Sequence, residues 1–179
     1  MSSATGILRD EHRVILHGLR SLEVAAERLG AGQALPPGLW DEMLGWFRAF
    51  ADRMHHAKEE NLLFPAMIKA GVPPRGGPID VMLDEHAEGR ALLAAMATGT
   101  GAERAARARR YVRLLCDHID KENGLLFPLA DAVLDARGDA ELRRELATVE
   151  AELGDAASLS AAEAAAARFA AALEASSGG

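Results

Sequence analysis

Histidine and glutamate recur at helical spacing in two parts of this sequence. His55 precedes Glu59 by four residues, and His118 precedes Glu122 by the same interval. Residues at this spacing lie on one face of an α-helix, one turn apart. Imidazole nitrogen and carboxylate oxygen together are ligands that suit iron, manganese or zinc. The spacing therefore indicates metal binding by side chains of two helices.

The two pairs belong to a longer internal repeat. The triplet Asp10-Glu11-His12 matches Asp84-Glu85-His86. The stretch 55–65 matches the stretch 118–128, and both end in Leu-Leu-Phe-Pro. Such self-similarity predicts two helix pairs related by an approximate two-fold axis, with the repeated polar residues converging where the halves meet.

Helical projection places these residues on apolar faces. At about 100° per residue, His12 and His86 fall within the apolar stripes of their helices. His118 and Glu122 fall near the centre of the apolar stripe of the fourth helix. That last stripe consists of Tyr111, Leu114, Leu115, Leu125 and Leu126. Burying an ionised carboxylate without a partner costs several kcal/mol, so something must satisfy these groups. A single histidine could be a core residue hydrogen-bonded to a carboxylate, but four inward histidines in a repeated pattern favour a metal site. Two glutamates from opposite helices could bridge two metal ions, with His12 and His55 on one ion and His86 and His118 on the other.

The second helix offers two candidates for each ligand. His55 is adjacent to His56, and Glu59 is adjacent to Glu60, which gives two pairs at i, i+4 spacing. Only one pair can face the core of an α-helix, and the apolar stripe of this helix lies closer to His55 than to His56. The repeat also aligns His55 with His118. We therefore predict His55 and Glu59 as ligands, and keep His56 and Glu60 as alternates or supporting groups.

Clusters of proline and glycine divide the chain into helical segments. We predict four long helices joined by short linkers, which is the pattern of an all-α, up-down-up-down four-helix bundle. Two further helices are expected after Gly138. The predicted ranges are 5–29, 38–70, 78–97, 101–136, 139–153 and 159–175.

This pattern assigns residues 1–137 to a metal-binding domain and residues 138–179 to an alanine-rich C-terminal helical extension. The last segment is nearly all alanine, so we expect it to cap the bundle, pack loosely or join an interface between copies of the chain. Pro65 and Pro128 lie at equivalent positions inside the second and fourth helices, where each should kink or locally break its helix.

Composition narrows the possible partners and the kind of metal site. Of 179 residues, 49% are hydrophobic and 26% charged, with a formal net charge of −7 and aromatic residues at 4%. This composition favours helices, and the negative charge without a basic run argues against nucleic acid as a partner. The single cysteine, Cys116, excludes an intramolecular disulfide and a thiolate metal cluster, so a metal site must use histidine and carboxylate.

Membrane and secretion signals are also missing from the sequence. No stretch approaches the roughly 20 apolar residues of a membrane span, and residues 1–13 lack the pattern of a secretion signal. We therefore expect a cytoplasmic protein with no membrane partner. Glycine-rich phosphate loops, a Ser-His-Asp order and His-Glu-x-x-His do not occur, nor do the Glu-x-x-His pairs of ferritin-like proteins.

Taken together, these motifs resemble the hemerythrin-like, HHE cation-binding domain over about residues 5–136. The resemblance is carried by one histidine in each of the first and third helices, by His-x-x-x-Glu in the second and fourth, and by the Leu-Phe-Pro that follows each pair. It implies an oxo- or hydroxo-bridged di-iron centre that reacts with dioxygen, peroxide or nitric oxide; manganese and zinc are alternatives. The resemblance makes terminal ligands of His12, His55, His86 and His118, and bridging ligands of Glu59 and Glu122.

Two departures bear on activity. Oxygen-carrying hemerythrins place a second histidine one turn after the first in the third helix, where this chain has Arg90. Their fourth helix provides an aspartate five residues after its histidine, and this chain has Glu122 instead. Four histidines would make the coordination more symmetric, which favours sensing, scavenging or iron buffering over reversible oxygen carriage. Arg90 could hydrogen-bond to a ligand carboxylate or a bound anion, or could extend into solvent.

Three functions therefore stand as hypotheses. The first is a di-iron protein that binds or senses a diatomic ligand or peroxide, or buffers iron. The second is an enzyme that consumes peroxide or nitric oxide at the same centre, including a weak peroxidase or catalase-like activity. The third is a metal-free or zinc-bound helical interaction module, in which the C-terminal segment forms a homo-oligomer.

Overall fold

The computed structural model describes residues 3–153 and 158–176, which contain helices and no strand. None of these helices is long and apolar enough to cross a membrane. The elements in chain order are α1 (Ala4–Gly30), α2 (Leu39–Trp46), η1 (Phe47–His56), η2 (Glu59–Leu63), α3 (Phe64–Lys69), α4 (Pro78–Met96), α5 (Gly101–Lys121), η3 (Glu122–Leu126), α6 (Phe127–Val133), α7 (Ala136–Leu153) and α8 (Leu159–Ala175).

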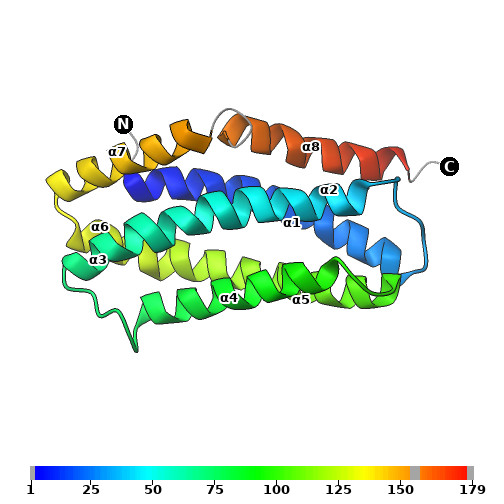
Figure 1. Cartoon of the computed structure of the whole chain (residues 1–179), viewed down its shortest axis with the longest axis horizontal. Helices are drawn as coiled ribbons and strands as arrows, with labels where there is room; N and C mark the ends of the chain where they lie inside the picture. The colour runs from blue at the N-terminus through cyan, green and yellow to red at the C-terminus, as the bar shows by residue number, and fades with distance from the viewer. Residues whose placement is uncertain (1–2, 154–157, 177–179) are drawn as a thin grey trace.

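Four helical rods run alternately up and down (Figure 1). The first is α1, the second runs from α2 to α3, the third is α4, and the fourth runs from α5 to α6. The predicted all-α, up-down-up-down bundle with additional C-terminal helices is confirmed. The observed ends lie within a few residues of the predicted ends because caps and glycines define them. At the start of α5, for example, the Thr100 side chain and Glu103 form a capping box.

The second and fourth rods each contain π-helix between two α-helical parts. Segments η2 and η3 occupy equivalent positions, and each is followed by Phe-Pro at the start of α3 or α6. Proline has no N–H, and in an α-helix its ring clashes with the carbonyl four residues earlier. The i→i+5 bonding of a π-helix opens the turn at that place. The local break expected at Pro65 and Pro128 is therefore a π segment in each rod.

These π segments change the direction of side chains relative to the α-helical projection. Leu125 was expected on the inward stripe of the fourth helix, but it lies in η3 and its side chain is 61% exposed. A π-helix turns less per residue than an α-helix, so a projection at 100° per residue accumulates an error across η3. The neighbouring Leu126 remains buried.

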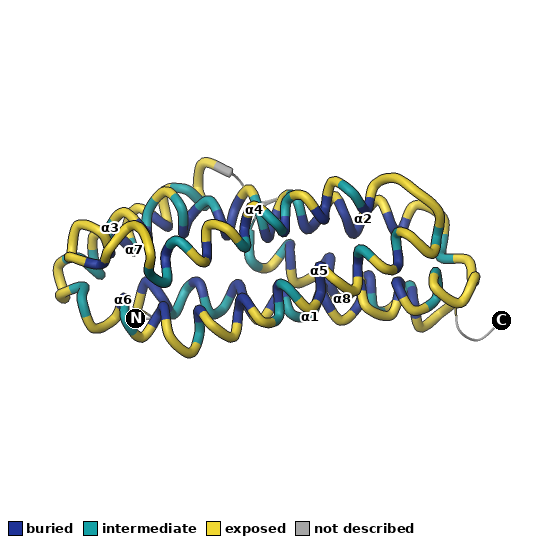
Figure 2. The backbone as a smooth tube through the Cα atoms, turned by 90° about the horizontal axis from the view of Figure 1, so that it is seen from below, coloured by how far each residue is buried: buried dark blue, intermediate teal, exposed yellow. Residues whose placement is uncertain are grey.

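Two hydrophobic clusters fill the bundle, and the buried histidines and glutamates lie between them. One cluster includes Ile15, Phe47 and Leu115, and the other includes Leu8, Leu63 and Phe127. In α1 the boundary falls between Leu8 and Ile15, at His12. Figure 2 shows buried positions along the inner sides of the rods.

The C-terminal extension packs along the outside of the bundle (Figure 1). Helix α7 contacts α1 and η2, and α8 contacts α1 and α2. The last segment was expected to cap the bundle, pack loosely or join an interface, and Phe169 is fully buried in the larger cluster together with alanines of α8. Ala166 has no exposed surface, because alanine allows close approach between helices. The apolar face of α8 is thus covered by its own chain, and oligomerisation through this segment stays a prediction.

Gly18 provides a test of the close packing between α1 and α2. A Cβ atom at position 18 would lie 2.4 Å from a ring carbon of Trp46, whereas a Cβ at Gly45 would meet nothing within 4 Å. We expect Gly18→Ala to lower the free energy of unfolding by about 1–3 kcal/mol through overpacking. Gly45→Ala should raise it by roughly 0.5–1 kcal/mol. Urea unfolding of the metal-free protein measures both, and an unchanged Gly18→Ala would show that Trp46 shifts without cost.

Candidate metal centre

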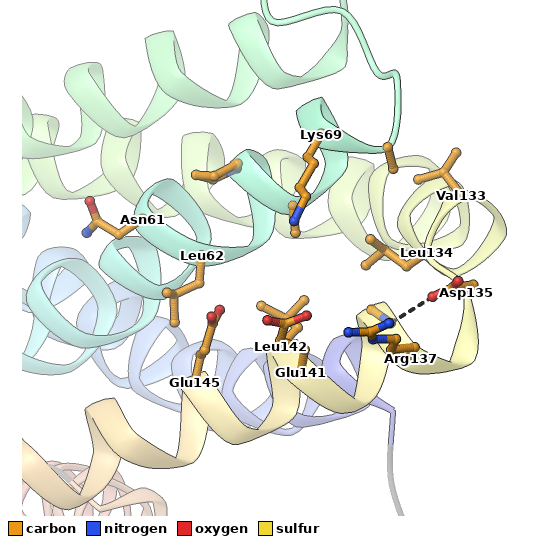
Figure 3. Close-up of a pocket in the computed structure, with 14 residues that line it drawn as sticks. Asn61, Leu62, Lys69, Val133, Leu134, Asp135, Arg137, Glu141, Leu142 and Glu145 are labelled. Carbon is orange, nitrogen blue, oxygen red and sulfur yellow. Dashed lines mark hydrogen bonds between the residues drawn. The ribbon is translucent and has the colours of Figure 1, made fainter.

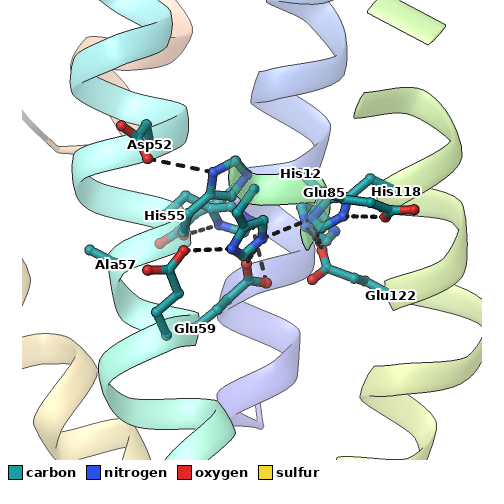
Figure 4. Close-up of polar contacts among 12 residues, drawn as sticks. His12, Asp52, His55, Ala57, Glu59, Glu85, His118 and Glu122 are labelled. Atoms are coloured by element: carbon teal, nitrogen blue, oxygen red, sulfur yellow. Dashed lines mark hydrogen bonds and ion pairs between the residues drawn. The ribbon is translucent and has the colours of Figure 1, made fainter. Parts of the chain in front are cut away.

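Five histidines and two glutamates meet between the hydrophobic clusters, and all are buried. They come from all four rods: His12 from α1, His55, His56 and Glu59 from η1 and η2, His86 from α4, and His118 and Glu122 from α5 and η3. Figure 4 shows side chains from α1 and from the second and fourth rods pointing toward one another. The structure therefore brings together all six residues predicted as ligands, and it adds His56.

The seven residues form two overlapping groups whose ligand atoms lie within 4.8 Å of one another. One group is His12, His55, Glu59 and Glu122, and the other is His56, Glu59, His86 and His118. We call them the His12/His55 group and the His86/His118 group. Each has the number and type of ligands that a transition metal takes from protein. Because Glu59 belongs to both, the arrangement suits two neighbouring cations.

Each glutamate lies between histidines of the two groups. One oxygen of Glu59 is 3.5 Å from His55 Nε2, and the other is 3.4 Å from His86 Nε2. Glu122 Oε2 is 3.1 Å from His12 Nε2 and 3.3 Å from His118 Nε2. These positions fit carboxylates that bridge two metal ions.

Six inward atoms of the cluster have no hydrogen-bond partner among the described residues: His12 Nε2, His55 Nε2 and both carboxylate oxygens of Glu59 and of Glu122. His86 Nε2 and His118 Nε2 instead hydrogen-bond to each other at 3.1 Å. A buried polar atom without a partner costs about 1–3 kcal/mol, and more if it is charged. Cations at the centre would satisfy these atoms together, so the residues present fit a metal site.

The outward ring nitrogens are held by oxygens. His55 Nδ1 donates to Glu11 at 2.7 Å, His86 Nδ1 to Glu60 at 2.7 Å, His118 Nδ1 to Glu85 at 2.9 Å, and His12 Nδ1 to Asn123 at 3.0 Å. A proton on Nδ1 leaves Nε2 free to bind metal, and such partners fix the orientation of metal-ligating imidazoles.

Glu60 was predicted as an alternate or supporting group, whereas Glu11, Glu85 and Asn123 were not predicted, although the repeat contained the signal. Glu11 and Glu85 occupy the same position in the two Asp-Glu-His triplets, and each supports a histidine of the following rod. Glu60 and Asn123 also occupy equivalent repeat positions, one residue after Glu59 and Glu122. The repeat therefore extends to the hydrogen bonds around the site.

The phenylalanines of the two Leu-Leu-Phe-Pro motifs pack against the same histidines. Phe127 stacks on His12 with ring centroids 5.2 Å apart, and Phe64 stacks on His86 at 6.0 Å. Both phenylalanines are buried. Their rings restrict the imidazoles and exclude water from the centre, which gives this part of the repeat a role at the site.

His56 corrects the prediction that only one histidine of the second helix can face inward. Both His55 and His56 are buried, and the His56 ring stacks on His86 at 3.9 Å. The projection assumed an α-helix, but both residues lie in η1, where a smaller turn per residue keeps neighbours nearer one face. The cluster therefore contains five histidines, and the ligand set of four histidines and two glutamates stays a prediction.

Arg90 and two carboxylates flank the His86/His118 group. Arg90 Nε donates to Asp52 at 2.6 Å and its terminal nitrogen donates to Glu60 at 2.6 Å. Asp52 lies 3.8 Å from His56 Nδ1, and Glu60 accepts from His86. Arg90 thus contacts Glu60, which supports His86, and Asp52, which lies near His56 without a hydrogen bond to it.

Burial and mutual contact set the protonation states of the metal-free cluster. Burial and the neighbouring Glu122 raise the pKa of Glu59 well above its usual range, so that carboxyl holds a proton. Burial acts to raise the pKa of Glu122, but His118 and His12 outweigh it and hold it well below its usual value. Burial acts to lower the pKa of His118, and Glu122 and Glu85 outweigh it to raise that pKa. Without metal, one glutamate is neutral and the other faces an imidazolium.

Metal binding should therefore release protons. A cation needs Glu59 as a carboxylate and His118 as neutral imidazole, so both protons must leave as metal enters. Because protons compete for these ligands, we expect metal affinity to rise with pH until both groups lose their protons and to fall as pH is lowered. Calorimetric titration in two buffers of different ionisation enthalpy counts the released protons. A pH-independent affinity with no proton release would contradict this assignment.

Comparison with known proteins places the chain in a family. No curated protein and no solved structure matches it. Residues 3–130, more than half of the 179, match the Hemerythrin HHE cation binding domain. This match covers all four rods except the last residues of α6, and every residue of the two overlapping groups. The chain belongs to the hemerythrin HHE cation-binding domain family.

Proposed function

We propose that this protein binds a pair of metal ions, one in each of the two overlapping groups, with Glu59 and Glu122 as bridging carboxylates. The observation that carries the proposal is the set of unpaired inward atoms on buried histidines and glutamates. His12 and His55 hold one ion; His86, His118 and His56 hold the other. Glu60 supports His86 from outside, so of the two alternates only His56 is proposed as a ligand.

Iron is the metal that we propose for this pair. The donor set of imidazole and carboxylate suits iron, and it also accepts manganese or zinc. A bound iron pair supplies electrons to dioxygen, peroxide or nitric oxide. The chain contributes orientation through the Nδ1 hydrogen bonds, and it excludes water through Phe64 and Phe127. Position 90 holds arginine, so we propose His56 as the third histidine of this ion, beside His86 and His118.

A role in sensing, scavenging or iron buffering is favoured over dedicated catalysis. The inward face of the centre holds metal-ligand atoms, and the charged residues around it are engaged in supporting the histidines. We propose action in the cytoplasm on a small ligand, without a nucleic-acid or membrane partner. The family resemblance and the acidic net charge support this proposal.

Single-turnover and steady-state measurements distinguish these functions. Iron(II)-loaded protein should reduce one peroxide to water for each pair of iron ions oxidised to iron(III), with two protons consumed. Peroxide loss that stops after this equivalent supports a sensor or store. Continued loss above a free-iron blank supports the peroxide-consuming enzyme, and folded protein that takes up no metal supports the interaction module instead.

A further inference from the structure

Lys58 is a buried ammonium held between carboxylates from two different parts of the chain. Its side chain has 0% exposure. Lys58 Nζ donates to Glu11 of α1 at 2.5 Å and to Glu150 of α7 at 2.6 Å. A buried ammonium needs such partners because it loses its hydration. The C-terminal extension therefore supplies one of the two charges that hold Lys58.

These contacts continue to the proposed metal site. Glu11 uses its other oxygen to accept the hydrogen bond of His55 Nδ1 at 2.7 Å. The four residues thus form a network from α7 to a ligand imidazole, in the order Glu150, Lys58, Glu11, His55. Lys58 also directly precedes Glu59 in the chain. Its position therefore affects both proposed ligands of this segment, His55 and Glu59.

The internal repeat provides the comparison within the same molecule. Lys121 pairs with Glu85, and Glu85 supports His118, as Lys58 and Glu11 do for His55. In the described part of the chain, however, no carboxylate takes the place of Glu150 beside Lys121. The Lys121 side chain is 42% exposed and that of Glu85 is 17% exposed. The extension therefore encloses one half of the site only.

The support of His55 differs in the same direction from the supports behind the His86/His118 group. Glu11 is buried with Lys58 behind His55, whereas Asn123, the support of His12, is half-buried. Asp52, Glu60 and Glu85, which lie behind the His86/His118 group, all retain contact with solvent. Water and small chelators can therefore reach the supports of the second group without displacing a helix.

We propose that α7 stabilises metal binding in the His12/His55 group. Glu150, acting through Lys58 and Glu11, positions His55 and slows loss of the ion from that group. The ion in the His86/His118 group, which has no such covering helix, leaves first. Glu150 is a positioning residue in this account and contacts no metal. The inference rests on the proposed function, because it needs an ion in each group.

Chelator-driven metal release from the full-length protein tests this inference. Wild-type protein loaded with iron(II) under anaerobic conditions should release metal to excess ferrozine in a fast and a slow phase. Glu150→Gln should speed the slow phase by roughly 10-fold or more, as for loss of a supporting partner, and leave the fast phase unchanged. Glu145→Gln is the matched control and should change neither phase, because Glu145 is an exposed residue of α7 that lines a pocket with Leu62 and Leu142 (Figure 3).

The outcomes separate the inference from the proposed function. A wild-type protein that binds fewer than two ions before chelator is added contradicts the proposed function itself. Two bound ions released in one phase, or equal acceleration of both phases by Glu150→Gln, would overturn the role of α7 alone. Unchanged release by Glu150→Gln would overturn it as well. Lys58→Met provides a second variant, which should also speed the slow phase, and urea unfolding of each metal-free variant shows that the bundle stays folded.

Discussion

Glu59→Gln is expected to reduce the metal content of the purified protein from about two ions per chain to below about one. Glu59 is the residue shared by the two groups, with one oxygen near His55 and the other near His86. Glutamine keeps the volume of the side chain, but it removes the negative charge and one acceptor oxygen. Loss of this single residue therefore weakens both groups, and metal analysis of the purified variant measures the effect.

Glu60→Gln is the matched control for that variant. Glu60 is adjacent in sequence and accepts from His86 Nδ1, so its loss should lower affinity about 10-fold without removing a ligand. With metal in excess, this variant should still bind two ions. Glu59→Gln should remain folded without metal, because burial disfavours the ionised carboxylate that the substitution removes. Loss of metal in Glu60→Gln but not in Glu59→Gln would reverse the assignment of these two residues.

His56→Ile is expected to remove the ion of the His86/His118 group and leave that of the His12/His55 group. The substitution installs the residue found at the equivalent repeat position, Ile119, so the packing volume remains suited to a buried helix position. The variant group retains His86, His118 and Glu59, which is one nitrogen ligand fewer. We expect metal content near half of wild type and affinity for the second ion lowered by at least about 10–100-fold.

Two measurements make the His56 prediction specific. Metal titration should show one tight and one weak site in His56→Ile, and two tight sites in the control Ile119→Val, which changes the equivalent position conservatively. An unchanged stoichiometry and affinity in His56→Ile would show that His56 is a packed core residue stacked on His86 and not a ligand.

The rods and six of the seven clustered residues could be predicted from the sequence because local signals specify them. Glycine and proline clusters end the helices, and His-x-x-x-Glu places two side chains on one face whatever the tertiary context. The repeat supplied the rest, since it aligned His12 with His86 and selected Glu59 over Glu60. The helix ends and the His-x-x-x-Glu spacing depend only on residues that are neighbours along one helix.

His56 and Leu125 could not be placed because they lie in π-helical segments. Projection on an α-helix assigned His56 to the wrong face and Leu125 to the core. The prolines indicated a local break but not its form. A repeat alignment does not help at position 56 either, because its counterpart is Ile119 and this histidine has no equivalent in the other half.

The role of the C-terminal extension depends on tertiary contacts, and its amino-acid composition does not indicate them. An alanine-rich helix with a few apolar residues offers little sequence signal, yet Ala166 and Phe169 are buried against the bundle. Similarly, Glu150 is one acidic residue among several in α7, and only the fold brings it to Lys58. Residues that support ligands from a distance are therefore the least accessible to sequence reasoning.

The number of metal ions per chain tests the central claim most directly. Iron, manganese and zinc should be measured together in full-length protein expressed in iron-supplemented medium and shown by circular dichroism to be helical. The two overlapping groups predict about two ions per chain, with iron the main metal. Folded protein that contains no metal, and that takes none up when iron(II) is added without oxygen, would contradict it.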